Sequence, residues 1–342
     1  MKILFIGGTG IISTACTELA VQQGLDLSLL NRGNRKSIAG TKQIMADISD
    51  VAATKSALGD SYWDVVVDFI SFHPDDLKKR LEIFDGRVGQ FIFISSASCY
   101  QKPVIDYLVT ESTPLVNPFW PYSRDKIACE LYLEKELRDN GFPVTIIRPS
   151  FTYGETVIPL SFNSWQHPYT VIDRMRKGLP VIIPGDGTSL WQLTHNADFA
   201  KGLLGLFGHQ RSIGHAFHIT TDEVLNWNQI FEATAEAAGV DKLNYVHIAS
   251  DFIAACMPDE EGGLHGDKSF SVVLDNTKIK RFVPDFVATR RYRDGIKRSI
   301  AWYDADPARQ LVDDVTNANY DKLITAYQSG LNECKRLFLK IN

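Results

Sequence analysis

Short runs of apolar residues alternate with amphipathic stretches through the first 150 residues of the chain. The apolar runs are continuous, as expected for strands that are buried on both faces. The amphipathic stretches have helical spacing, and Gly24 and Gly141 each follow the end of one. This alternation predicts βαβ units and a doubly wound parallel sheet of the α/β class, with helices on both faces. The apolar runs are residues 3–6, 27–30, 65–69, 91–94 and 144–147.

The pattern changes after residue 151. Residues 153–168 are rich in proline, aromatic and small polar side chains, and they predict a long irregular connection. Helical patterns return farther along the chain, without the regular alternation of the first part. We therefore expect a first domain of the doubly wound class and a smaller, mixed α/β second portion. The first domain is predicted over residues 1–151 with parts of about 187–221, and the second portion over 152–186 and 222–342.

A glycine-rich segment, Gly7-Gly8-Thr9-Gly10, follows the first predicted strand and precedes the first predicted helix. Such a turn lets the backbone approach a pyrophosphate, which then lies at the N-terminus of the helix. At this place in the chain the motif predicts a dinucleotide site, and an ordinary tight turn is the alternative. The first domain is therefore expected to be a dinucleotide-binding Rossmann domain, and the second to be the substrate portion. Ser13 stands where the usual fingerprint has its third glycine. We expect Gly7, Gly10, Ile11 and Ile12 to contact the cofactor.

The segment after the second predicted strand, residues 31–35, lacks the carboxylate that would bind the ribose hydroxyls of NAD. Arg32 and Arg35 suit the 2′-phosphate of NADP instead, because a guanidinium binds phosphate through two donors. The sequence therefore favours NADP over NAD, although two solvated loop arginines would give the same pattern. Asn31 is expected at the cofactor. Asp47 either touches the adenine or caps a helix that begins near residue 51.

Serines and a tyrosine–lysine pair form the candidate active site. Ser95, Ser96 and Ser98 follow the strand predicted at residues 91–94, and Tyr122 and Lys126 lie four residues apart at the start of a predicted helix. That spacing puts both side chains on one helix face. An ammonium near a phenol lowers the pKa of the phenol, so that tyrosine can act as a general acid and base. A serine hydroxyl can hold the substrate oxygen meanwhile.

These motifs resemble the short-chain dehydrogenase/reductases, in particular the extended NAD-dependent epimerase/dehydratase branch. The resemblance implies that Tyr122 is the acid/base, that Lys126 lowers its pKa and contacts the ribose, and that Ser96 orients a carbonyl. It also implies that Ser95 and Pro149 lie at the cofactor, with Pro149 against the nicotinamide. The motifs that carry the resemblance are residues 7–10, 93–100, 122–126, 148–149, 185–188, 194–198 and 294–303.

The chain departs from that branch at positions that affect the reaction. The 4,6-dehydratases have an Asp-Glu pair after the catalytic hydroxyl, and here Ala97 and Ser98 take those places. Elimination of water by that route is therefore not expected. Ser98 is expected instead near the substrate. His195 and Asp198 match family positions that are structural, and we expect them to form a buried hydrogen-bonded pair.

Two further departures concern the substrate. Nucleotide-sugar enzymes of the branch usually have an asparagine where Phe151 stands, and a phosphate-binding arginine where Trp191 stands. Arg174 or Arg176 could replace the missing charge. Without one, Phe151 and Trp191 are expected to contact the substrate as part of an aromatic wall that suits a neutral ring. The alternative is that these aromatic side chains fill the domain interface. The further members of this wall are Tyr153 and Trp165.

Composition narrows the remaining possibilities. With 36 Lys and Arg against 41 Asp and Glu, the net charge of −5 argues against a general binder of nucleic acid or anionic membranes. No apolar run approaches the roughly 18–20 residues of a membrane span. The five cysteines are scattered without a C-x-x-C pair, which fits a reducing cytoplasm. No metal site is expected, and His215 and His218 are interpreted as surface imidazoles.

The sequence thus predicts an NAD(P)(H)-dependent epimerase or oxidoreductase of the extended short-chain type. Its substrate would be a small, sugar-like secondary alcohol or ketone. Simple NADP-dependent reduction of a ketone is the alternative within enzymes. Because some plastid relatives of this family are described as mRNA-binding proteins, RNA binding is a second alternative, against which the net charge counts. Apolar stripes on the predicted helices serve either the core or the seam of a homodimer.

Overall fold

The computed structural model describes residues 1–36 and 38–339. The chain divides into two compact units. The first consists of Met1–Gly154, Gln192–Glu223 and Val273–Arg290, and the second of Glu155–Trp191, Val224–Val272 and Arg291–Asn342. The sequence assigned Val273–Arg290 to the substrate portion. This segment joins the first unit because its strand β15 (Val273–Leu274) pairs in parallel with β6 (Leu108–Val109).

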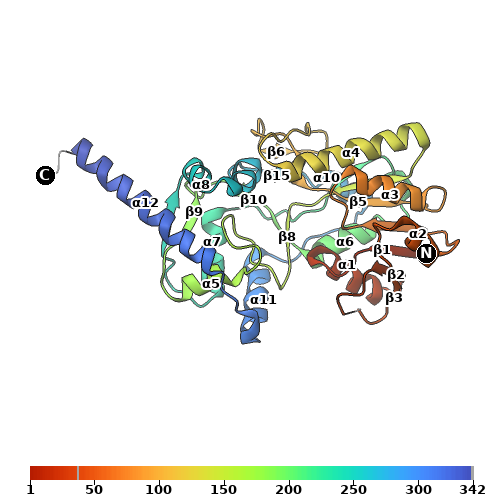
Figure 1. Ribbon diagram of the computed structural model, residues 1–342, viewed down its shortest axis with the longest axis horizontal. Helices are drawn as coiled ribbons and strands as arrows, with labels where there is room; N and C mark the ends of the chain where they lie inside the picture. The colour runs from red at the N-terminus through yellow and green to blue at the C-terminus, as the bar shows by residue number, and fades with distance from the viewer. Residues whose placement is uncertain (37, 340–342) are drawn as a thin grey trace. The chain divides into compact units, whose positions relative to one another are not determined.

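A seven-stranded sheet in which all neighbouring strands are parallel forms the centre of the first unit (Figure 1), and the doubly wound α/β class is confirmed. The spatial order is β12-β7-β5-β4-β1-β2-β3, so the chain leaves β1 in two opposite directions. Ligands of such sheets bind at the carboxyl ends of the strands, where the order reverses. The strands are β1 (Lys2–Ile6), β2 (Asp26–Asn31), β3 (Lys42–Met45), β4 (Val65–Asp68), β5 (Phe91–Ile94), β7 (Val144–Arg148) and β12 (Ala216–His218).

Helices cover both faces of this sheet (Figure 1). On β1, Ile3 and Phe5 pack toward one apolar core, and Leu4 and Ile6 pack toward the other. Both sets are apolar because each face of the strand is buried, which explains the continuous apolar runs of the sequence. One core contains side chains of α1 (Ile11–Gln22), α6 (Asn196–Gly205) and α10 (Thr277–Phe282), and the other those of α2 (Val51–Leu58), α3 (Pro74–Phe84) and α4 (Pro121–Asn140).

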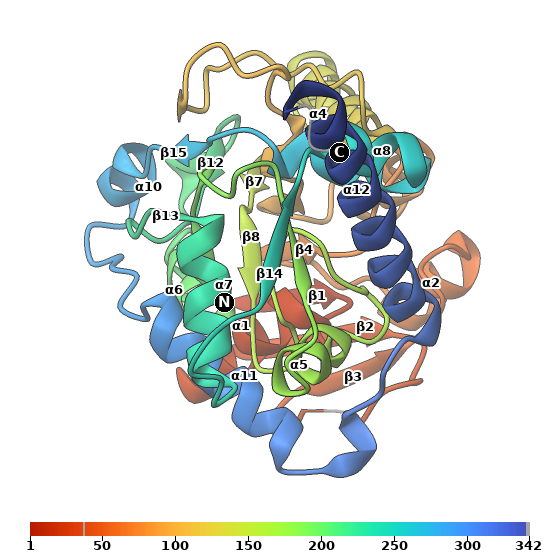
Figure 2. The same ribbon diagram turned by 90° about the vertical axis from the view of Figure 1, so that its left-hand side faces the viewer.

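The second unit is built around short strand pairs and helices. Its strand β14 is parallel to β9, and Figure 2 shows α7 and α12 beside this pair. The hydroxyls of Thr234 and Tyr292, 2.7 Å apart, join α7 to α11 inside the unit. No helix within the described residues is long and apolar enough to cross a membrane. The elements are α5 (Tyr169–Arg176), β9 (Val181–Pro184), β10 (Leu190–Trp191), β13 (Leu225–Asn226), α7 (Trp227–Ala237), β14 (Tyr245–Ile248), α8 (Ser250–Cys256), α11 (Tyr292–Asp304) and α12 (Asp314–Leu339).

A buried ion pair fixes the carboxyl end of β4 at the point where the strand order reverses. Asp68 is fully buried and accepts hydrogen bonds from the Ile70 and Ser71 amides at 2.9 and 3.0 Å. The Arg80 Nε donates to it from α3 at 3.1 Å, and the Arg80 guanidinium also donates to the Ile48 carbonyl. These bonds hold the segment after β4 in one conformation beside the glycine loop.

We expect Arg80→Met to lower the free energy of unfolding by about 3 kcal/mol, because the Asp68 carboxylate stays buried without its cation. Lys55→Met is the matched control, since the Lys55–Glu82 pair is exposed and its loss costs within about 1 kcal/mol. Urea denaturation of both variants makes the comparison. Equal losses would show that Arg80 does not stabilise the end of β4.

Candidate cofactor and active site

The loop between β1 and α1 has a backbone that requires glycine. Gly7 and Gly8 have φ angles of 103° and 93°, in the region that other residues rarely adopt. A Cβ on Gly8 would also lie 2.6 Å from the Leu29 Cδ2. The loop therefore passes close to β2 and delivers the chain to the start of α1 at Ile11.

The N-terminus of α1 is suited to an anion. The Gly10 amide donates to the Ser13 Oγ at 2.8 Å, so the residue that replaces the third glycine caps the helix. The amides that follow have no acceptor within the helix, and Ile11 is 44% exposed. A Cβ on Gly10 would have only the Ser13 Oγ as a neighbour, at 3.4 Å. This open cradle of amides fits the pyrophosphate of a dinucleotide.

The arginines after β2 lie at the same end of the sheet. The Arg35 guanidinium donates to the Thr9 carbonyl, which ties this segment to the glycine loop. Asn31 shapes the turn, since its Oδ1 accepts from the Gly33 amide at 2.9 Å. Arg32 is exposed. Part of the hydrogen-bonding capacity of Arg35 is thus used by the protein backbone.

Asp47 lies near Arg32 on the exposed surface. Hydrogen bonds from Ser49 lower the pKa of Asp47, and the charge of Arg32 acts in the same direction. The alternative that Asp47 caps the next helix is wrong, because Asp50 accepts from the Ala53 amide at 2.9 Å and caps α2.

Lys126 is buried at the carboxyl ends of two strands, with only 2% of its surface exposed. Its Nζ donates to the Ser71 carbonyl after β4 at 2.7 Å and to the Ile94 carbonyl of β5 at 2.9 Å. The rings of Phe72 and Phe93 lie 4.5 and 4.8 Å from the ammonium. Burial lowers the pKa of Lys126. Two carbonyls therefore fix the ammonium, and a third N–H is left to point elsewhere.

Tyr122 stands one turn before Lys126, at the start of α4. The phenol is half-buried, and the centroid of its ring lies 6.2 Å from that of Phe72 and 5.0 Å from that of the Trp120 ring. The helix presents both side chains on one face, as the spacing predicts. The structure thus brings the predicted acid/base pair to the carboxyl ends of β4 and β5.

Three serine hydroxyls form a chain beside this pair. The Ser123 hydroxyl donates to the Ser98 Oγ at 2.8 Å, and the Ser98 and Ser96 hydroxyls are 2.9 Å apart. The Ser98 amide also donates to the Ser96 Oγ at 3.2 Å. Ser98 and Ser123 are buried, whereas Ser96 is half-buried. Sequence reasoning missed Ser123, although its position directly after Tyr122 was a signal.

Ser95 points the other way, into a buried polar network. Its hydroxyl donates to Glu130, whose carboxylate also accepts from the Arg148 Nε at 3.0 and 3.1 Å. Arg148 in turn donates to the Tyr100 hydroxyl at 2.9 Å. The Ser95 hydroxyl is thus bonded to α4, and the expected contact of Ser95 with the cofactor stays a prediction. Pro149 is buried, and its carbonyl accepts from the Ala97 amide at 2.9 Å.

Two expectations about histidines are wrong. His218 is buried rather than on the surface, its Nδ1 lies 3.2 Å from the Asp275 carbonyl, and burial lowers its pKa to about 3. His195 and Asp198 are both buried, but they have different partners. The His195 Nδ1 accepts from a backbone amide, whereas Asp198 accepts from Lys201 at 2.6 Å. A buried side chain contacts residues from several elements, and sequence spacing does not reveal which of them are its partners.

The comparisons with known proteins agree with this geometry. The sequence model of the NAD dependent epimerase/dehydratase family matches residues 3–220. The chain belongs to the NAD-dependent epimerase/dehydratase family. Relatives of this chain are named as epimerases, dehydratases and reductases.

Individual relatives of this family member differ in what they do. A chloroplast stem-loop binding protein of Arabidopsis thaliana is 29% identical over 261 residues, which are 72% of this chain and 65% of that protein. A UDP-glucose 4-epimerase of Lactobacillus helveticus is 25% identical over 334 residues, covering 90% of this chain and 98% of the epimerase. The structure of an epimerase from Methanothermobacter thermautotrophicus has a TM-score of 0.70 at 16% identity, over 90% of this chain and 93% of that one, and supports the fold alone.

The aromatic side chains of this epimerase/dehydratase-family protein are mostly interior. Trp191 is 4% exposed and packs on Trp227 in the second unit, with ring centroids 5.3 Å apart. Tyr153 is buried against His195 in the first unit. Burial of Trp191 and Tyr153 favours the alternative that these aromatic side chains fill the interior, and their contact with a substrate stays a prediction. Phe151 is half-buried and Trp165 is 67% exposed.

Trp191 stands where related enzymes have a phosphate-binding arginine, and neither arginine of α5 is free to supply that positive charge. Arg174 is fully buried and donates to the Asp321 carboxylate at 2.6 Å and to the Pro180 carbonyl. Arg176 forms a two-pronged pair with Asp304 at 2.7 and 2.8 Å. Within the described residues, no group of three or more His, Cys, Asp and Glu side chains could hold a metal ion.

We expect Gly10→Val to abolish dinucleotide binding in a protein that still folds. The φ of −91° at Gly10 suits any residue, and the branched side chain would enter the cradle above the helix N-terminus. Calorimetric titration with NAD⁺ and NADP⁺ measures the loss. Gly330→Val is the control, because a Cβ there meets nothing within 4 Å. Unchanged cofactor affinity in folded Gly10→Val would contradict the assignment of this loop.

Proposed function

We propose that the protein is an NAD(P)-dependent epimerase or oxidoreductase that acts on a sugar-like secondary alcohol or ketone. Tyr122, Lys126 and Ser96 would be its catalytic residues. The nicotinamide supplies the hydride acceptor or donor when the dinucleotide is bound. The observation that carries the proposal is the position of the Lys126 ammonium. The carbonyls of Ser71 and Ile94 hold the ammonium near the start of α4. Tyr122 lies one turn earlier on the same face of this helix.

In this proposal, Tyr122 takes the hydroxyl proton of an alcohol substrate and returns it to the ketone oxygen. The fixed ammonium of Lys126 stabilises the phenolate by its charge, and its third N–H remains for the phenol or a ribose hydroxyl. Because two carbonyls already hold Lys126, little reorganisation is needed when the phenolate forms. This role requires Lys126 to stay charged although burial lowers its pKa.

Ser96 would hold the reacting oxygen, and the serine chain determines how. Ser123 donates to Ser98, so the Ser98 hydroxyl has its own proton to give to Ser96. The Ser98 amide also donates to the Ser96 Oγ. Because the Ser96 oxygen then accepts two hydrogen bonds, its own hydroxyl proton can be donated to the substrate oxygen. Ser98 and Ser123 are thus positioning residues, and Ser96 acts as a hydrogen-bond donor to a carbonyl or alkoxide.

The substrate of this enzyme is not a nucleotide diphosphate sugar held in the usual way of the family. A pyrophosphate that loses water without a cationic partner costs several kcal/mol. Trp191 replaces the expected arginine, and the carboxylates of Asp321 and Asp304 engage Arg174 and Arg176. Binding of a free sugar, a glycoside or another neutral ring does not require a charged group to lose its water. An epimerase would transfer hydride twice, on opposite faces of a transient ketone, and a simple reductase once.

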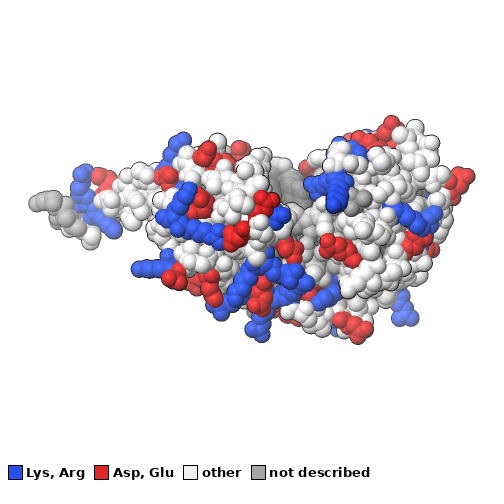
Figure 3. Space-filling model, turned by 90° about the horizontal axis from the view of Figure 1, so that it is seen from below, with Lys and Arg blue, Asp and Glu red and all other residues white. Residues whose placement is uncertain are grey.

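RNA binding is the second candidate function, because one relative is named as a stem-loop binding protein. The mixture of acidic and basic side chains on the second unit argues against RNA binding. Acidic and basic side chains are interspersed on the face in Figure 3, and on α11 Arg293 pairs with Glu236 while Arg298 pairs with Glu155. Such a surface lacks the continuous basic stripe that a phosphate backbone favours.

The test of the proposed function is cofactor reduction with a panel of free sugars, methyl glycosides and UDP-, GDP- and dTDP-sugars. We expect turnover on a member without a nucleotide. Tyr122→Phe should abolish it while cofactor affinity stays the same, because only the transferable proton is lost. Ser123→Ala should lower kcat about fivefold to tenfold, since one positioning hydrogen bond is removed.

Tyr132→Phe, on the same helix, is the matched control and should keep full activity. Most of the activity surviving in Tyr122→Phe would overturn the mechanism. Absence of turnover across the panel, together with salt-dependent retention on stem-loop RNA, would favour the second candidate.

We expect Arg32→Ala to weaken NADP⁺ binding by about 2 kcal/mol and NAD⁺ binding much less, because the exposed guanidinium of Arg32 would pair with the 2′-phosphate. Lys42→Ala is the control, since Lys42 pairs with Asp26 on neighbouring strands. Competition titrations with both dinucleotides measure the difference. Equal losses for NAD⁺ and NADP⁺ would mean that Arg32 is only a solvated loop residue.

A further inference from the structure

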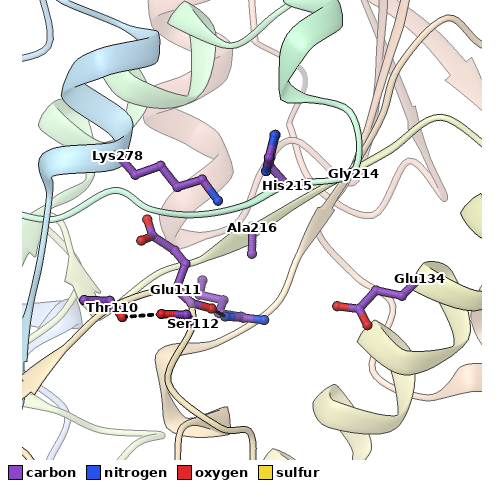
Figure 4. A pocket seen from close by; sticks show the side chains of 9 residues that line it. Thr110, Glu111, Ser112, Glu134, Gly214, His215, Ala216 and Lys278 are labelled. Carbon is purple, nitrogen blue, oxygen red and sulfur yellow. Dashed lines mark hydrogen bonds between the residues drawn. The ribbon is translucent and has the colours of Figure 1, made fainter.

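A pocket of about 380 Å³ opens in the first unit beside the edge strand β12, and we call it the edge pocket (Figure 4). The loop after β6, the helices α4 and α10, and the residues that lead into β12 line it. Its ionisable side chains are Glu111, Glu134, Arg148, His215 and Lys278. Nothing in the proposed reaction uses these residues.

Lys278 enters the edge pocket near the charge of Glu111 but without direct contact to a carboxylate. It is half-buried on α10, and Figure 4 shows its side chain pointing toward Glu111 and His215. The ammonium lies 5.0 Å from the centroid of the Phe217 ring, and it makes no hydrogen bond or ion pair with any residue that the structure describes. Burial lowers the pKa of Lys278. The ammonium is therefore partly shielded from water and has no hydrogen-bond acceptor in the described part of the chain.

Two carboxylates face the same space. Glu111 accepts from the His218 amide at 3.2 Å, and burial raises its pKa. Glu134 lies across the pocket on α4, as Figure 4 shows, and it too has no hydrogen bond or ion pair to the described part of the chain. Arg148 adds no net charge, because Glu130 neutralises it. The pocket thus holds separated charges of both signs.

Separated opposite charges that have lost water are costly, and only a direct partner compensates for that loss. A simple anion would satisfy Lys278 but would face two carboxylates. A simple cation would satisfy Glu134 and Glu111 but would face the ammonium. A small molecule with a carboxylate at one end and an ammonium at the other satisfies both at once.

We propose that the edge pocket binds a small zwitterion of the amino acid class, with its carboxylate at Lys278 and its ammonium toward Glu134 and Glu111. The hydroxyls of Thr110 and Ser112, 2.9 Å apart, add polar contacts at the rim. The pocket volume of about 380 Å³ falls within the range of small-molecule sites. This site is independent of the reaction proposed for Tyr122.

Three related probes test the proposal: L-alanine, propionate, which is alanine without the ammonium, and ethylammonium, which is alanine without the carboxylate. Saturation-transfer NMR on the methyl protons reports the binding of each to the full chain. We expect L-alanine to bind about tenfold more tightly than either single-charge probe, because only it satisfies both charges. Lys278→Met and Glu134→Gln should each weaken L-alanine binding about tenfold.

The matched controls are Lys280→Met and Glu136→Gln, which should leave the signal unchanged. Lys280 is on the same helix as Lys278 but pairs with Asp222, and Glu136 is on the same helix as Glu134. Equal binding of propionate and L-alanine would show a plain anion site and overturn the proposal. An L-alanine signal that survives Lys278→Met would overturn it as well.

Discussion

The buried ion pair between Arg148 and Glu130 is the interaction on which the geometry of the first unit depends. It joins the carboxyl end of β7 to the middle of α4, and both side chains are almost fully enclosed. A buried pair is stable only when its remaining hydrogen-bonding groups are satisfied. Ser95 and Tyr100 provide those bonds. Because the same helix carries Lys126, this pair sets the distance between the candidate acid/base and β5.

The serine chain reflects the departure of this chain from the 4,6-dehydratases. Where those enzymes have two carboxylic acids, this chain has Ala97 and Ser98, and the aliphatic hydroxyl of a serine is a poor proton donor or acceptor near neutral pH. It can, however, orient a neighbouring hydroxyl. The bonds from Ser123 through Ser98 to Ser96 do this without a charge. The arrangement suits hydride transfer to and from a ketone better than the elimination of water.

Local pattern was enough to predict five of the seven strands of the sheet, the glycine loop and the shared face of Tyr122 and Lys126, because each lies within one element or one turn. It did not reveal partners from distant segments. The Arg35 bond to Thr9 joins two loops, and the Arg174 pair joins α5 to a residue near the C-terminus. The burial of His218 likewise depends on contacts with distant segments. Spacing determines the face of an element, whereas partners depend on how the elements pack.

The distribution of arginine and lysine partners connects these observations. Arg80, Arg148 and Arg174 are buried, and each one pairs with a carboxylate of its own unit, so none can neutralise a ligand without leaving that carboxylate behind. Arg32 and Lys278 have no such pair among the described side chains. A bound anion is favoured where a cation is available at little cost. Among these cations, Arg32 after β2 and Lys278 in the edge pocket therefore keep a charge that is available to a ligand.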